Sequence, residues 1–184
     1  GVTLGSVART AAVSLRGCYV SSHSTAAAAR AVAVGAVSGS VAITTSFLSA
    51  TALRDGAALH VAGIEAEPGA LQRPCFTASD VELLVAGEAG AGASLGRLSE
   101  GTATLQRARV RLSGSRSVGV RVASAADATL NVFGCSLRSV AETGHADGIF
   151  VQSASTTAHV MVYGSRFALS GAALNFATSG WGEA

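Results

Sequence analysis

The segment Val13-Ser-Leu15-Arg-Gly-Cys18-Tyr-Val20 decides the fold, because its pattern recurs along the chain. Two apolar residues alternate with polar ones, a two-residue corner follows, and a small residue then precedes a larger apolar one. Alternation with a period of two is typical of a strand with one buried face, whereas an amphipathic helix places its apolar residues three and four positions apart. Three clear copies follow the first, at residues 41–48, 130–137 and 160–167.

Weaker copies at residues 70–76 and 103–110 complete a regular repeat. A second alternating segment lies between successive copies, so we expect two short strands in each repeat. The copies start at residues 13, 41, 70, 103, 130 and 160, with spacings of 28, 29, 33, 27 and 30 residues. The second segments are residues 32–34, 59–61, 83–85, 120–122, 149–151 and 174–176.

A repeat of 27–33 residues made of short strands and turns fits one coil of a right-handed parallel β-helix. Propeller blades are longer, and the leucine-rich pattern with its asparagine is absent. The sequence therefore predicts an all-β solenoid of about six coils. With coils about 4.8 Å apart, the rod would be on the order of 29 Å long. We expect residues 1–184 to form one segment of a longer solenoid, with the Gly/Ala-rich stretch 86–100 as a loop.

The composition agrees with stacked coils. Of 184 residues, 49% are hydrophobic but only 5% are aromatic, and 22 are glycine. An ordinary globular core recruits more large side chains. A narrow solenoid interior takes one side chain per strand position in each coil, which favours Ala, Val, Ser and Cys. The mean hydropathy of +0.45 excludes an intrinsically disordered chain.

Over almost the whole chain, this repeat resembles the right-handed parallel β-helix, or pectin-lyase-like, superfamily. The phrases Gly56-Ala-Ala-Leu-His-Val61 and Val13-Ser-Leu-Arg-Gly-Cys18 also resemble the dispersed gene family surface proteins of kinetoplastid parasites. Autotransporter passengers and other bacterial β-helix adhesins are alternatives. These resemblances imply an extracellular or cell-surface location, within a membrane-associated parent protein.

All 13 basic residues are arginine, and the formal net charge is +2, which is too small to predict binding of nucleic acid. The apolar stretch 25–45 is interrupted by Arg30, Gly35 and Gly39, so we predict no transmembrane span in this segment. Five arginines are close together in the second half of the chain. They are Arg107, Arg109, Arg111, Arg116 and Arg121.

Within this group, Arg109 and Arg111 alternate with Val110 and Leu112, so both guanidinium groups should project into solvent. The guanidinium fork fits carboxylate and sulfate groups. We therefore predict that the five arginines contact an acidic glycan or another anionic cell-surface partner. The alternative is a solvated face that blocks edge pairing and keeps the rod soluble.

Glu142, His145 and Asp147 bring a histidine and two carboxylates together, in a turn between two strands. They support an alternative function, a polysaccharide-degrading enzyme like the polygalacturonases and pectate lyases that share the β-helix. Glycoside hydrolysis requires two carboxylates that flank the bond, and pectate lyases hold Ca²⁺ with grouped aspartates. This chain has only four, scattered aspartates and no lysine. We therefore expect the three residues to cap their turn and predict no catalytic residue.

Three cysteines, Cys18, Cys75 and Cys135, take the same place in coils one, three and five. Equivalent positions two coils apart are about 9.6 Å from each other, beyond the Cα separation of roughly 7 Å that a disulfide tolerates. We therefore predict free, buried thiols. Neither a CxxC motif nor a paired-histidine spacing indicates a metal site, and we predict no cofactor.

Six coils without a recurrent group of carboxylates predict a noncatalytic structural or interaction module of a surface or adhesin-like protein. The expected partners are an acidic glycan or a host or other cell-surface protein. Self-association is expected as well, because the end of a solenoid exposes edge strands.

Overall fold

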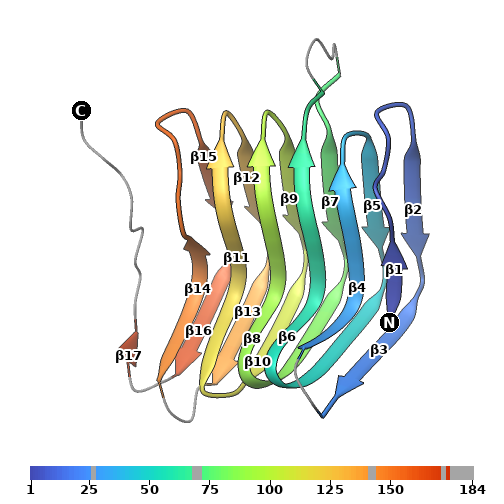
Figure 1. Ribbon diagram of the computed structural model, residues 1–184. Coiled ribbons are helices and arrows are strands. Elements are labelled where there is room, and N and C mark those ends of the chain that lie inside the picture. The colour runs from blue at the N-terminus through green and yellow to red at the C-terminus, as the bar shows by residue number, and fades with distance from the viewer. Residues whose placement is uncertain (26–27, 68–71, 141–143, 171–172, 175–184) are drawn as a thin grey trace.

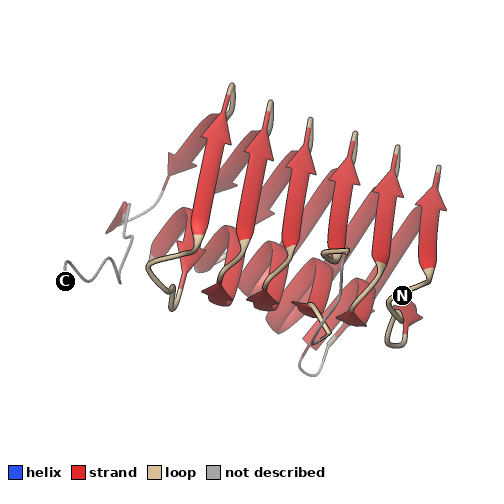
Figure 2. Cartoon of the chain, turned by 90° about the horizontal axis from the view of Figure 1, so that it is seen from above, coloured by secondary structure: helices blue, strands red, loops and turns tan. Residues whose placement is uncertain are grey.

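The computed structural model describes residues 1–25, 28–67, 72–140, 144–170 and 173–174 (Figure 1). Within these residues the regular secondary structure is β-strand, and the strand pairs are parallel. The strands stack into a solenoid of about six turns, as the sequence predicts. Seen from above, equivalent strands of successive coils lie side by side (Figure 2). Among the described residues, no helix has the length and apolar character needed to cross a membrane.

Each coil contributes to three faces, which we call the back sheet, the base and the front (Figure 1). The back sheet consists of β2 (Ala12–Arg16), β5 (Ser40–Thr44), β7 (Cys75–Ser79), β9 (Thr102–Gln106), β12 (Thr129–Phe133) and β15 (His159–Tyr163). The base contains β3 (Tyr19–Ser24), β10 (Arg109–Ser113), β13 (Ser136–Val140) and β16 (Arg166–Ser170). The front contains β1 (Val2–Leu4), β4 (Ala28–Val37), β11 (Arg116–Ala126), β14 (His145–Val151) and β17 (Ala173–Leu174).

Two long strands, β6 (Phe47–Glu65) and β8 (Glu82–Ser99), run through both the base and the front. The pairing between them shifts register between Ala52 and Asp55, where the chain passes from the base to the front. The expectation of two strands per repeat therefore holds for these two coils and is wrong for the others, in which the base and the front have separate strands. The base strand was not recognised as a separate strand because it begins within the last residues of the sequence motif, as β3 does at Tyr19.

The register of the back sheet corrects one of the predicted copies. The third copy starts at Phe76 and not at Ala70, because Phe76 is the residue that pairs with Val41. Cys75 before Phe76 imitates Cys18 before Tyr19, and this similarity misplaced the copy. The repeats are therefore 28, 35, 27, 27 and 30 residues long. This spacing follows from one inward-facing row, which contains Val13, Val41, Phe76, Ala103, Leu130 and Val160.

The predicted loop at residues 86–100 is also wrong, since residues 86–99 belong to strand β8. Their small side chains reflect close packing. A Cβ atom on Gly92 would collide with Val110 Cγ1, and one on Gly90 would come within 2.8 Å of Val85 Cγ1. The extra residues of the longest repeat lie instead between the end of β6 and the start of β7.

The corner between the back sheet and the base has the same backbone conformation in all six coils. Its residue is left-handed, with φ between 50° and 63°. Glycine adopts this conformation readily, whereas any other residue in it destabilises the fold by about 1 kcal/mol or more. The corner row is Gly17, Thr45, Asp80, Arg107, Gly134 and Gly164. Because the amide of one corner donates to the next coil, as Gly17 does to the Thr44 carbonyl at 3.1 Å, the row also holds coils in register.

The interior is filled by apolar side chains from all three faces. Small residues on the front make room for larger ones on the base: a Cβ atom on Gly119 would collide with Leu137 Cδ1 and come 2.5 Å from the Gly148 carbonyl oxygen. The predicted dominance of small side chains thus has a steric cause. Phe76, which is 0% exposed, shows that the interior also accepts an aromatic ring.

Candidate binding face

The five arginines of the predicted patch lie on different faces of the solenoid. Arg109 and Arg111 project outward from β10 on the base, where exposed and buried residues alternate. Arg107 occupies the corner before β10. Arg116 and Arg121 lie on β11, on the front. The five arginines are therefore close together in the sequence but do not form one continuous surface.

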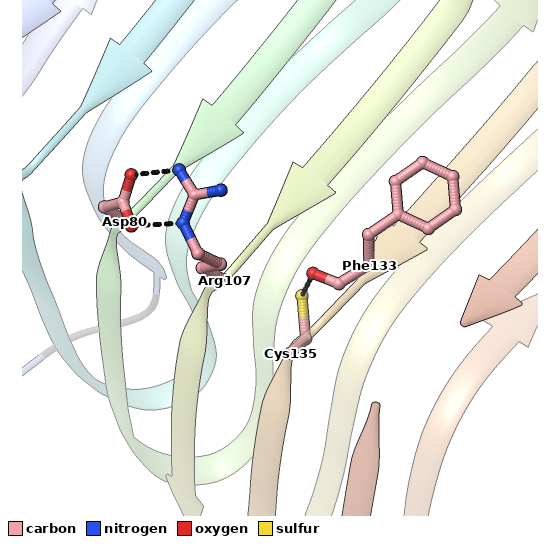
Figure 3. Close-up of polar contacts among 4 residues, drawn as sticks. All are labelled: Asp80, Arg107, Phe133 and Cys135. Carbon is pink, nitrogen blue, oxygen red and sulfur yellow. Dashed lines mark hydrogen bonds and ion pairs between the residues drawn. The ribbon is translucent and has the colours of Figure 1, made fainter. Parts of the chain in front are cut away.

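Arg107 is engaged by a carboxylate of the preceding coil. Its Nε and Nη2 donate to Oδ1 and Oδ2 of Asp80, each at 2.7 Å (Figure 3). This bidentate hydrogen bond lowers the pKa of Asp80. On the front, Arg121 Nη1 lies 4.0 Å from Asp55 Oδ1. An anionic ligand at either arginine would have to compete with an aspartate.

The base carries a cluster of arginines that differs from the predicted patch. Two of its members were not predicted from the sequence. Arg138 of β13 pairs in register with Arg111, and Arg166 of β16 follows on the next coil. Within the described residues Arg111 has a carboxylate at 3.5 Å, on Glu82, while the other members make no salt bridge. We call Arg109, Arg111, Arg138 and Arg166 the base arginine cluster. The signal that could have found it is spacing, because Arg138 follows Arg111 by one 27-residue repeat.

The other half of the base presents aromatic side chains. The rings of Tyr19 and Phe47 stack with centroids 4.9 Å apart and an interplanar angle of 4°. Tyr19 is nevertheless 76% exposed, because it lies in the first coil. The outer row that begins at Tyr19 ends at Arg166. This face therefore changes from aromatic to basic along the solenoid axis.

Of the three residues of the alternative catalytic site, Glu142 lies outside the described residues. His145 and Asp147 belong to strand β14, and not to a turn as expected. Since they are two positions apart, they share the outer face of the front. Burial raises the pKa of Asp147, while the charges of His145 and Arg121 oppose this rise. In the part of the chain that the structure describes, no three His, Cys, Asp or Glu residues are grouped so that they could hold a metal ion.

The cysteines are free thiols, but only Cys135 is buried. Cys18 and Cys135 follow the corner in coils one and five, as expected. Cys75 instead starts β7 and donates its thiol proton to Ser40 Oγ at 3.3 Å, because of the register correction at Phe76. Burial raises the pKa of the Cys135 thiol, which donates a hydrogen bond to the Phe133 carbonyl at 3.4 Å (Figure 3).

Comparisons with known proteins found no family model, no curated protein and no solved structure that matches this chain.

Proposed function

We propose that this chain is a noncatalytic binding module of an extracellular surface or adhesin-like protein, and that its base arginine cluster contacts an acidic glycan. The observation that carries the proposal is the pairing of Arg111 with Arg138 on an exposed face. Like charges directly opposite each other on neighbouring strands are destabilising. A bound carboxylate or sulfate would offset this repulsion, and the guanidinium fork fits both groups.

The shape of the cluster favours a polymer over a single small ion. Its four members lie on three successive coils, which span about 10 Å along the axis. One small anion covers only part of that length, whereas an acidic glycan repeats its charge along the chain. An anionic cell-surface protein is the competing partner, and a glycan-binding experiment separates the two.

We also propose a family for this chain. The stack of about six parallel coils supports a place in the pectin-lyase-like β-helix superfamily. The phrases at residues 13–18 and 56–61 support the narrower assignment to the dispersed gene family surface proteins of kinetoplastids.

The test compares two double variants that lose the same charge. Arg111→Ala/Arg138→Ala removes the paired members of the cluster, and Arg54→Ala/Arg97→Ala removes two exposed arginines elsewhere. Charged hydrogen bonds contribute about 1.5–3 kcal/mol each, so we expect the first variant to lose about tenfold or more in affinity for heparin or polygalacturonate. The affinity of the control variant for these glycans should stay within about twofold of that of the unmodified chain. Neither variant should bind neutral dextran.

Equal elution of both variants from a heparin column would remove the base arginine cluster as the binding site. If the unmodified chain binds neither acidic glycan, the glycan proposal fails, and the cell-surface protein becomes the leading partner.

A further inference from the structure

The edge at which the chain passes from the front to the back sheet, uppermost in Figure 1, contains a small pocket at the second coil. The connection in this coil consists only of residues 38–39, between β4 and β5. The connections on either side are longer: residues 5–11 separate β1 from β2, and residues 66–74 separate β6 from β7. The short connection therefore forms the floor of the pocket, and residues of the two neighbouring coils form its walls.

The pocket has a volume of about 130 Å³ and a polar, cationic lining. Its lining includes Arg9 from the first coil, Ser38 and Ser40 from the second, and Arg73 and Cys75 from the third. None of the residues that line it is an aspartate or a glutamate. The pocket therefore carries the charge of two arginines from opposite walls, with hydroxyl groups on the floor between them.

Both arginines are available to a ligand. Arg9 and Arg73 are exposed, and within the described residues neither makes a salt bridge. Arg107, by contrast, is held by both carboxylate oxygens of Asp80. An anion that enters the pocket would therefore not have to displace a carboxylate.

Backbone contacts hold the floor of the pocket to both walls. The amide of Ser38 donates to the Val7 carbonyl at 2.9 Å, and the amide of Cys75 donates to the Gly39 carbonyl at 3.0 Å. A Cβ atom on Gly39 would collide with the Ala11 carbonyl oxygen, so glycine allows the floor to lie directly against the first wall. The pocket is thus formed before a ligand arrives, which reduces the ordering that binding requires.

We propose that this pocket binds a tetrahedral oxyanion, that is, a sulfate or phosphate group. Pockets for drug-sized ligands have volumes of about 300–1,000 Å³, so this pocket fits a single such group, as a free ion or as the charged end of a larger molecule. Guanidinium groups form strong hydrogen bonds with oxyanions. Four tetrahedral oxygens can accept from two opposite walls and the floor together, whereas the two oxygens of a carboxylate lie in one plane.

Cys75 provides the readout for the test, because it lines the pocket and its thiol donates to Ser40 Oγ at 3.3 Å. A bound anion should cover Cys75 and slow its reaction with iodoacetamide, a neutral reagent. Cys18 is also partly exposed but lies outside the pocket lining, so it is the control within the same chain. Peptide mass spectrometry measures both rates in one sample.

Sulfate and phosphate are titrated separately against sodium chloride of equal ionic strength. We expect each anion to slow the labelling of Cys75 severalfold at saturation and to leave the labelling of Cys18 unchanged. The ratio of the two half-protecting concentrations gives the preference of the pocket for sulfate or phosphate. Acetate should require a concentration about tenfold higher or more for the same effect, because it offers fewer acceptor oxygens.

Two double variants that lose the same charge locate the site. Arg9→Gln/Arg73→Gln removes both guanidinium groups of the pocket and should raise the half-protecting concentration of sulfate about tenfold or more. Arg54→Gln/Arg97→Gln removes two exposed arginines elsewhere and should change it by less than about twofold. Since all four side chains are exposed, neither variant should change the melting temperature.

Three results would overturn the proposal. The first is a Cys75 labelling rate that neither sulfate nor phosphate lowers relative to that of Cys18. The second is equal protection in the two double variants. The third is a loss of protection in Arg111→Ala/Arg138→Ala, which would place the anion on the base arginine cluster. Equal protection by acetate would overturn the assignment to a tetrahedral anion. Because the pocket and the base are different surfaces, the glycan experiment and this one fail independently.

Discussion

Val132 and Val162 occupy the same inner row of the back sheet in successive coils, yet one is 2% exposed and the other 46%. Their side chains and backbone conformation are alike, so the difference comes only from the presence of a further coil on one side. Stability in this fold is therefore local: each coil is stabilised by its two neighbours, and a terminal coil by one. Substitutions at matched positions in inner and end regions measure this difference directly.

The largest effect is expected at an inner glycine. Gly119→Ala should lower the free energy of unfolding by about 3 kcal/mol, because the added methyl group collides with Leu137 and crowds the Gly148 carbonyl. The control is Gly5→Ala, near the first coil, where no heavy atom lies within 4 Å of the new Cβ atom. Urea denaturation followed by circular dichroism measures both variants. Equal loss of stability in the two would mean that Gly119 does not pack as described.

A smaller effect is expected from removing one side chain from the shared row. Val132→Ala should cost about 2 kcal/mol, through lost burial and the cavity left behind. Val162→Ala should cost less than about 1 kcal/mol at low protein concentration, since half of that side chain already meets water. The same denaturation experiment decides the point. A larger cost at Val162 than at Val132 would contradict the locality of the coils.

The smallest effect concerns reactivity. Cys135 is buried and its thiol pKa is raised, so at a given pH it carries less thiolate, the reactive form, than an unshifted thiol would. Cys18 occupies the equivalent corner of the first coil and is partly exposed. Labelling of the folded chain with iodoacetamide, followed by peptide mass spectrometry, should modify Cys18 about tenfold faster or more, because Cys135 reacts only after local opening. The rates should become similar in urea, and equal rates in the folded chain would contradict the burial of Cys135.

Period-two alternation and recurrence were sufficient to predict the parallel solenoid and its six coils, because each strand carries its own pattern of inward and outward residues. They were insufficient at Phe76, where a cysteine before an aromatic residue imitated the corner of the first coil. They also failed at residues 86–100, since glycine permits flexibility and close packing alike. The side chains of Val85 and Val110, which pack against Gly90 and Gly92, show that here glycine serves close packing.

The candidate site was less predictable than the fold. Sequence proximity grouped Arg107, Arg116 and Arg121 with the arginines of β10, although a corner and two faces separate them. Arg138 and Arg166 lie 27 and 55 residues beyond Arg111, and strand pairing brings them onto the same face. In a solenoid, surface neighbours are one repeat apart in the sequence, so a surface is found by aligning coils and not by scanning along the chain.

The 35-residue second repeat has a consequence for how such chains change. The chain leaves the strands after Glu65 and re-enters at Cys75, and the pairing of Val41 with Phe76 is the same as in repeats that are eight residues shorter. The edge between the front and the back sheet therefore absorbs insertions without moving a strand. A peptide inserted at this edge should therefore be displayed beside strands that keep their pairing.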